Sequence, residues 1–124
     1  MSAGFMLTIE GAPRTKKNSG EIWRPRGGGV RYVASAAYRR WESAALPQLR
    51  SAWAGRPAID YPVNVRAVFY REANIGDAVG YYQALADALE KAGVLVNDRF
   101  IVSWDGTRMS KDAARPRIEC RIEF

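Results

Sequence analysis

The sequence predicts an α+β fold in which two α-helices pack on a mixed β-sheet. Three observations predict it. Short β-compatible segments lie at both ends of the chain, two longer segments have apolar residues every three or four positions, and Gly, Pro and Asp clusters separate them. The 124 residues match the length of one ordinary domain, without a repeat or linker. We therefore expect a single domain over residues 1–124.

The N-terminal third predicts a strand and a hairpin. Phe5–Glu10 is short and β-compatible, and a Gly-Ala-Pro turn follows it. A polar, basic loop occupies residues 14–20. Ile22–Arg24 and Arg31–Val33 then flank a run of glycines at 27–29, which is typical of a hairpin with a flexible tip.

The next segment predicts the first helix and a buried strand. Ser35 is a good N-cap for a helix that reaches about Trp53, and we expect Pro47 to kink it. The apolar stripe of this helix comprises Tyr38, Trp41, Ala45 and Leu49. A strand follows at about Val63–Tyr70, and its core-facing residues are Val63, Val65, Ala67 and Phe69.

The second helix is expected from Ala78 to about Ala92, because Asp77 can cap its start and Gly93 can end it. At about 100° per residue, the expected buried stripe comprises Ala78, Tyr82, Leu85, Leu89 and Ala92. Gly80, Gln83 and Asp87 are expected on the opposite, polar face.

Two strands are expected at the C-terminal end. Phe100–Met109 predicts a strand that is interrupted at Asp105-Gly106. In the last strand Ile118, Cys120, Ile122 and Phe124 are expected to face the core, and Arg117, Glu119, Arg121 and Glu123 to face solvent. Cys120, the single cysteine, is therefore expected to be a core residue.

The charge balance favours an acidic partner. The chain has 19 Lys and Arg against 13 Asp and Glu, a formal net charge of +6, which fits binding to a phosphate backbone. The candidate DNA-binding residues in the basic loop and hairpin are Lys16, Lys17, Asn18, Arg24, Arg26 and Arg31. The alternative is that these charges belong to an ordinary solvated surface.

The absence of histidine excludes Ser-His-Asp and Cys-His catalysis and leaves carboxylates as the candidate catalytic groups. Carboxylate oxygens are preferred ligands of Mg²⁺ and Mn²⁺. The candidates are Asp77, Asp87, Asp98 and Asp105. Each also has a structural interpretation as a cap, a solvated residue or a turn former. Because the two ends of the second helix are about 20 Å apart, Asp98 must return along the sheet to meet Asp77.

Several segments together resemble one family. Residues 76–89 (GDAVGYYQALADAL) and 91–99 (KAGVLVNDR) resemble the central signature of the RusA family of Holliday-junction resolvases, and residues 13–19 (PRTKKNS) resemble its opening Pro-x-x-Lys-Asn-Ser element. Residues 105–108 and 115–119 are similar to a phage-associated branch. The resemblance implies a RusA-like fold and a homodimeric, Mg²⁺-dependent endonuclease that resolves Holliday junctions or other branched DNA in recombination and repair. The resemblance also implies that Mn²⁺ can replace Mg²⁺.

The resemblance also implies roles for individual residues. The metal-binding aspartates of the family fall on Asp77 and Asp98, whereas its second aspartate, an asparagine and a helper lysine fall on Val79, Gly80 and Gln83. We expect either that Asp87 or Asp105 replaces the missing ligand, or that the protein binds branched DNA without cutting it.

The remaining expectations concern location and other partners. No apolar run approaches the roughly 20 residues that span a membrane, so we expect no membrane partner. The resemblance implies a cytoplasmic protein of a bacterial or phage-infected cell. The alternative to DNA is a partner that is RNA or an acidic protein.

Overall fold

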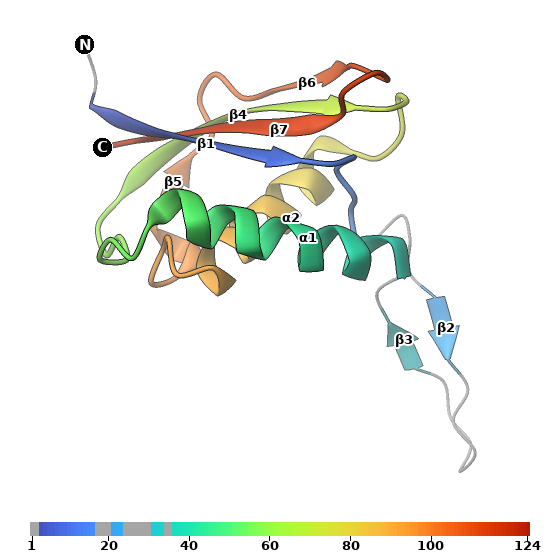
Figure 1. Cartoon of the computed structure of the whole chain (residues 1–124), viewed down its shortest axis with the longest axis horizontal. Coiled ribbons are helices and arrows are strands. Elements are labelled where there is room, and N and C mark those ends of the chain that lie inside the picture. The colour runs from blue at the N-terminus through green and yellow to red at the C-terminus, as the bar shows by residue number, and fades with distance from the viewer. Residues whose placement is uncertain (1–2, 17–20, 24–30, 34–35) are drawn as a thin grey trace.

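The computed structural model describes residues 3–16, 21–23, 31–33 and 36–124 (Figure 1). For the two short segments 21–23 and 31–33 the description covers the backbone. The elements in chain order are β1 (Gly4–Glu10), β2 (Glu21–Trp23), β3 (Arg31–Val33), α1 (Ala36–Trp53), β4 (Val63–Arg71), α2 (Ala78–Lys91), a 3₁₀ turn (Asp98–Phe100), β5 (Ile101–Ser103), β6 (Arg108–Lys111) and β7 (Arg117–Glu123). The predicted α+β class is confirmed, and the elements follow the predicted order except that the single interrupted strand expected at Phe100–Met109 is a 3₁₀ turn and two strands, β5 and β6.

The main sheet is mixed, as expected. Its strand order is β1-β7-β4-β5, and β6 also pairs with β4. β7 is antiparallel to both β1 and β4, whereas β5 and β6 run parallel to β4. β5 pairs with the start of β4 and β6 with its end, since Val63 is opposite Ile101 and Phe69 is opposite Met109. The predicted interruption at Asp105-Gly106 is the turn between these two short strands.

Both helices cover one face of the sheet (Figure 1). The core lies between them and the inward side chains of the strands, and the predicted inward residues of β4 are all buried. The whole predicted stripe of α1 is buried too, and α1 continues past Pro47 to Trp53. Ser35, its predicted N-cap, lies outside the described residues. Burial raises the pKa of the Cys120 thiol to about 12, so this predicted core residue is an inert, protonated side chain.

The buried stripe of α2 differs from the prediction. It comprises Gly80, Tyr81, Ala84, Leu85, Ala88 and Leu89. The prediction that Gly80 faces solvent is wrong, because the segment after β1 packs across the first turn of α2. A Cβ atom on Gly80 would be 3.1 Å from Cγ2 of Thr15, which is itself buried. Tyr82 is half-buried instead of being a core residue.

Phe124 also differs from the prediction. It was expected to continue the core face of β7, but β7 ends at Glu123 and the Phe124 side chain is 49% exposed. Its ring lies edge-on to the exposed ring of Tyr61, with 6.0 Å between the ring centroids. Within the described ranges, no helix has the length and apolar character needed to cross a membrane.

Candidate functional site

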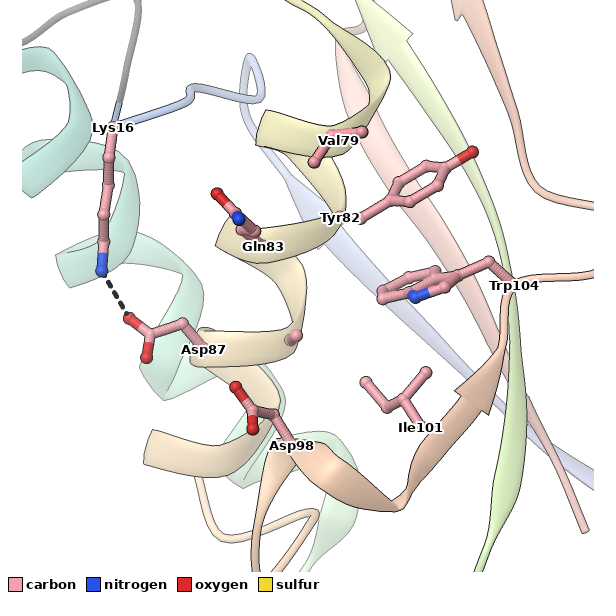
Figure 2. A pocket seen from close by; sticks show the side chains of 9 residues that line it. Lys16, Val79, Tyr82, Gln83, Asp87, Asp98, Ile101 and Trp104 are labelled. Carbon is pink, nitrogen blue, oxygen red and sulfur yellow. Dashed lines mark hydrogen bonds and ion pairs between the residues drawn. The ribbon is translucent and has the colours of Figure 1, made fainter.

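A cavity of about 500 Å³ lies between α2, the segment after β1 and residues 98–104 (Figure 2). We call it the α2 pocket. Its lining residues are Lys16, Val79, Tyr82, Gln83, Ala86, Asp87, Asp98, Ile101 and Trp104. The residues come from segments far apart in the sequence, and the volume is within the range of small-ligand sites. The α2 pocket is therefore our candidate functional site.

Ion pairs define the polar side of the α2 pocket. Nζ of Lys16 lies 3.1 Å from Oδ2 of Asp87, and Nζ of Lys91 lies 3.3 Å from the same oxygen. Lys91 also pairs with Glu42 of α1 at 2.9 Å. Partial burial acts to raise the pKa of Asp87, but the hydrogen bonds from Lys16 and Lys91 outweigh it and leave that pKa below its usual value. Asp87 is therefore an ionised and neutralised carboxylate.

Asp98 returns to the α2 pocket beside Asp87, not beside Asp77. The turn after α2 is held by a hydrogen bond of 2.9 Å from the Asp98 backbone N–H to Oε1 of Glu90. Asn97 caps the following 3₁₀ turn. The exposed carboxylate of Asp98 consequently lies on the same side of the pocket as Asp87 (Figure 2).

Asp77 and Asp105, the other two acidic candidates, do not line the α2 pocket. Asp77 is the N-cap of α2, and its Oδ1 accepts a hydrogen bond of 3.0 Å from the Gly80 N–H. At 1.5 Å per residue, it lies about 15 Å along the helix axis from Asp87. Asp105 is in the exposed β5–β6 turn, where its backbone N–H and carbonyl both bond to the Asn64 side chain. The structure thus brings together two of the four predicted carboxylates.

These positions do not fit a Mg²⁺ ion held by the protein alone. Among the residues that the structure describes, no group of three or more Asp, Glu, Cys or His side chains could hold a metal ion. Of the two carboxylates in the α2 pocket, Asp87 is already neutralised by lysines. Val79, where the resemblance implies an aspartate, presents an apolar side chain with 58% exposure.

Aromatic rings form the other side of the α2 pocket. The rings of Tyr82 and Trp104 are stacked, with 4.7 Å between centroids and 14° between planes. Tyr82 stacks in turn on the fully buried ring of Phe69, at 6.0 Å and 29°. Sequence reasoning assigned Tyr82 to the core and missed Trp104. The available signal was a large aromatic residue immediately before the Asp105-Gly106 turn, where a fully buried side chain is unusual.

The predicted DNA-binding residues are only partly within the described structure. Lys16 lies at the α2 pocket with a side chain that is 52% exposed. Lys17, Asn18, Arg24 and Arg26 lie outside the described residues. Arg31 begins β3, which pairs antiparallel with β2 as the predicted hairpin requires. These two strands lie near the start of α1, apart from the main sheet (Figure 1).

Comparison with models of known protein families and with curated proteins finds no match for this chain.

Proposed function

We propose that the protein is a RusA-type protein that binds branched DNA, such as a four-way junction, through the α2 pocket. One observation carries this proposal. Of the five positions on which the resemblance places metal-binding and helper residues, 79, 83 and 98 line one pocket and 77 and 80 do not, and Lys16 from the resemblance near the N-terminus lines it as well. Positions 79 and 83 are neighbours on α2, so the support comes from positions 16 and 98, which reach the same pocket from other segments.

Electrostatics support DNA as the partner. The chain has a net charge of +6, and Lys16 reaches the pocket with half of its side chain in contact with solvent. An exposed lysine–carboxylate pair contributes only about 0–1 kcal/mol. A DNA phosphate can therefore take the place of Asp87 as the partner of Lys16 at little cost.

The second candidate function is the Mg²⁺-dependent endonuclease itself, with Mn²⁺ as a substitute. It is favoured by Asp87 and Asp98, two carboxylates that line one pocket. Protein sites often bind Mg²⁺ through one or two carboxylates together with phosphate oxygens of the substrate. It ranks second because the described residues do not form a metal site without DNA.

The proposal includes a homodimer that acts in the cytoplasm of a bacterial or phage-infected cell, during recombination, repair or phage replication. A four-way junction has strands related by two-fold symmetry, which a symmetric dimer matches. Light scattering of the purified chain measures its mass directly. A particle of twice the 13.8 kDa chain mass supports the dimer, and a monomer at all concentrations contradicts it.

The experiment is a gel-shift and cleavage assay on a labelled four-way junction, with linear duplex of equal arm length as control and with Mg²⁺ or Mn²⁺ added. Junction binding without cutting supports a binding protein. Symmetric nicks that disappear in Asp98→Asn, while binding stays, support the endonuclease. Equal affinity for junction, duplex and RNA overturns both and favours a general basic interaction protein.

A further inference from the structure

The two sides of the α2 pocket differ in chemistry. Figure 2 shows Lys16, Asp87 and Asp98 on one side and the aromatic rings on the other. The aromatic side is extended by three smaller apolar side chains, Val79, Ala86 and Ile101. A ligand that matches both sides therefore combines a flat apolar face with polar edges, and a negatively charged group on it has Lys16 as its partner among the described lining residues, beside the two carboxylates.

The aromatic side is formed before any ligand binds. Trp104 lies between β5 and β6, whereas Tyr82 lies on α2, so the stacked pair joins two separate elements. The contact of Tyr82 with buried Phe69 continues this stack into the core. A ligand that packs against these rings consequently pays little for ordering them.

A nucleotide with an unpaired base has these features. Its base offers a π-face to an aromatic side chain, its edge offers donors and acceptors to Gln83 and Asp98, and its phosphate is a partner for Lys16. A base inside a duplex is stacked and paired, so it cannot enter a concave pocket unless it is extruded. A four-way junction presents such a nucleotide when a base pair at its branch point opens, and a bulged duplex presents one permanently.

We propose that the α2 pocket binds one unpaired nucleotide, with the base against the Trp104 side and the phosphate at Lys16. This inference rests on the proposed function and adds what is recognised within branched DNA. It makes Trp104 a specificity-determining residue that distinguishes unpaired from paired nucleotides. Contacts to the duplex arms do not depend on it.

The test compares two labelled duplexes that differ only in one unpaired 2-aminopurine nucleotide, bulged in the first and absent from the second. Fluorescence anisotropy at fixed salt gives both affinities. We expect tighter binding of the bulged duplex and shielding of its 2-aminopurine from acrylamide. Trp104→Ala should weaken binding of the bulged duplex about fivefold or more, with no change for the paired duplex.

Three further variants control this result. Trp104→Phe keeps an aromatic ring and should retain most of the preference for the bulge. Tyr61→Ala removes an aromatic side chain that is 45% exposed outside the pocket, and should change nothing. Ala86→Leu places a larger side chain in the pocket from α2 and should reduce binding of the bulged duplex. This variant tests the inference independently if Trp104→Ala does not fold. Thermal unfolding identifies any variant that is not folded.

The inference is overturned if Trp104→Ala and Ala86→Leu lose the same affinity for the bulged and the paired duplex. It is also overturned if neither variant loses affinity for the bulged duplex. The two proposals fail in different ways. A protein that prefers four-way junctions but does not distinguish the bulged from the paired duplex retains the proposed function and loses this inference. A protein with no preference for any branched substrate loses the proposed function.

Discussion

Nζ of Lys16 lies 3.1 Å from Oδ2 of Asp87, and this contact joins the segment after β1 to α2 on the polar side of the α2 pocket. Lys91 lies between Asp87 and Glu42 of α1, at 3.3 and 2.9 Å. The ion pairs thus connect three segments that are distant in the sequence. We expect them to position the polar side of the α2 pocket more than to stabilise the fold, since each pair is partly exposed.

Lys16→Ala is expected to weaken junction binding and to lower the slope of log affinity against log salt by about 0.9, the value for one lost phosphate contact. Unfolding by urea should change little, because the pair with Asp87 is exposed. Lys111→Ala is the matched control, since Lys111 is an exposed lysine that does not line the α2 pocket. An unchanged salt slope in Lys16→Ala contradicts a phosphate contact at this position.

Acid should remove the stabilisation that the Asp87 ion pairs provide. The folded protein lowers the pKa of Asp87 from the ordinary value of 3.8. The contribution is therefore fully present above that value and is lost as the pH falls through the lower folded pKa. Urea unfolding of wild type and Asp87→Asn at pH 7, 5 and 3 measures it. We expect a difference of less than about 1 kcal/mol at pH 7 that shrinks toward pH 3, and a constant difference would argue against the pairs.

Much of the fold was predictable from local patterns. The alternation in β4 and β7 and the apolar spacing in α1 identify their buried faces, and Asp77 and Gly93 mark the ends of α2. These features depend on neighbouring residues and need no knowledge of distant contacts.

The features that depend on distant contacts were not predictable in the same way. Burial of Gly80 requires Thr15 to pack on it, and no periodicity within α2 reports that contact. Asp98 lies at the pocket with Asp87 because of the turn that Glu90 holds, whereas the family resemblance implied a metal site of Asp98 with Asp77. Trp104 joins the site only because β5 and β6 pair with the same strand.

Asp77 should contribute to stability as a helix cap. Asp77→Ala removes the acceptor for the Gly80 N–H and should lower the free energy of unfolding by about 1 kcal/mol. Asp77→Asn keeps an acceptor and should cost much less. Urea unfolding compares the two with Asp60→Ala, a change at an exposed aspartate outside the helices. Equal losses in both Asp77 variants would mean that the charge, not the cap, is what matters.

Val79→Asp should give the α2 pocket a third carboxylate. The position is 58% exposed in the first turn of α2, where an acidic residue is favourable by about 0.3–1 kcal/mol. We expect the variant to fold, to show a rise in melting temperature with added Mg²⁺ that wild type lacks, and to cut more junction than wild type does in the same time. Val79→Asn introduces a side chain with the shape of aspartate but without its charge, and it should show neither effect. A Val79→Asp protein that is folded but indifferent to Mg²⁺ would contradict the placement of a metal-binding residue at position 79 that the resemblance implies.

The most direct measurement is a competition experiment at physiological ionic strength, in which unlabelled four-way junction and unlabelled linear duplex displace a labelled junction from the wild-type protein. Binding of branched DNA through the α2 pocket predicts that the junction displaces the label at a concentration at least tenfold lower than the duplex, and that the ratio falls in Lys16→Ala and Trp104→Ala. Equal displacement by both competitors, unaffected by either variant, would contradict the account.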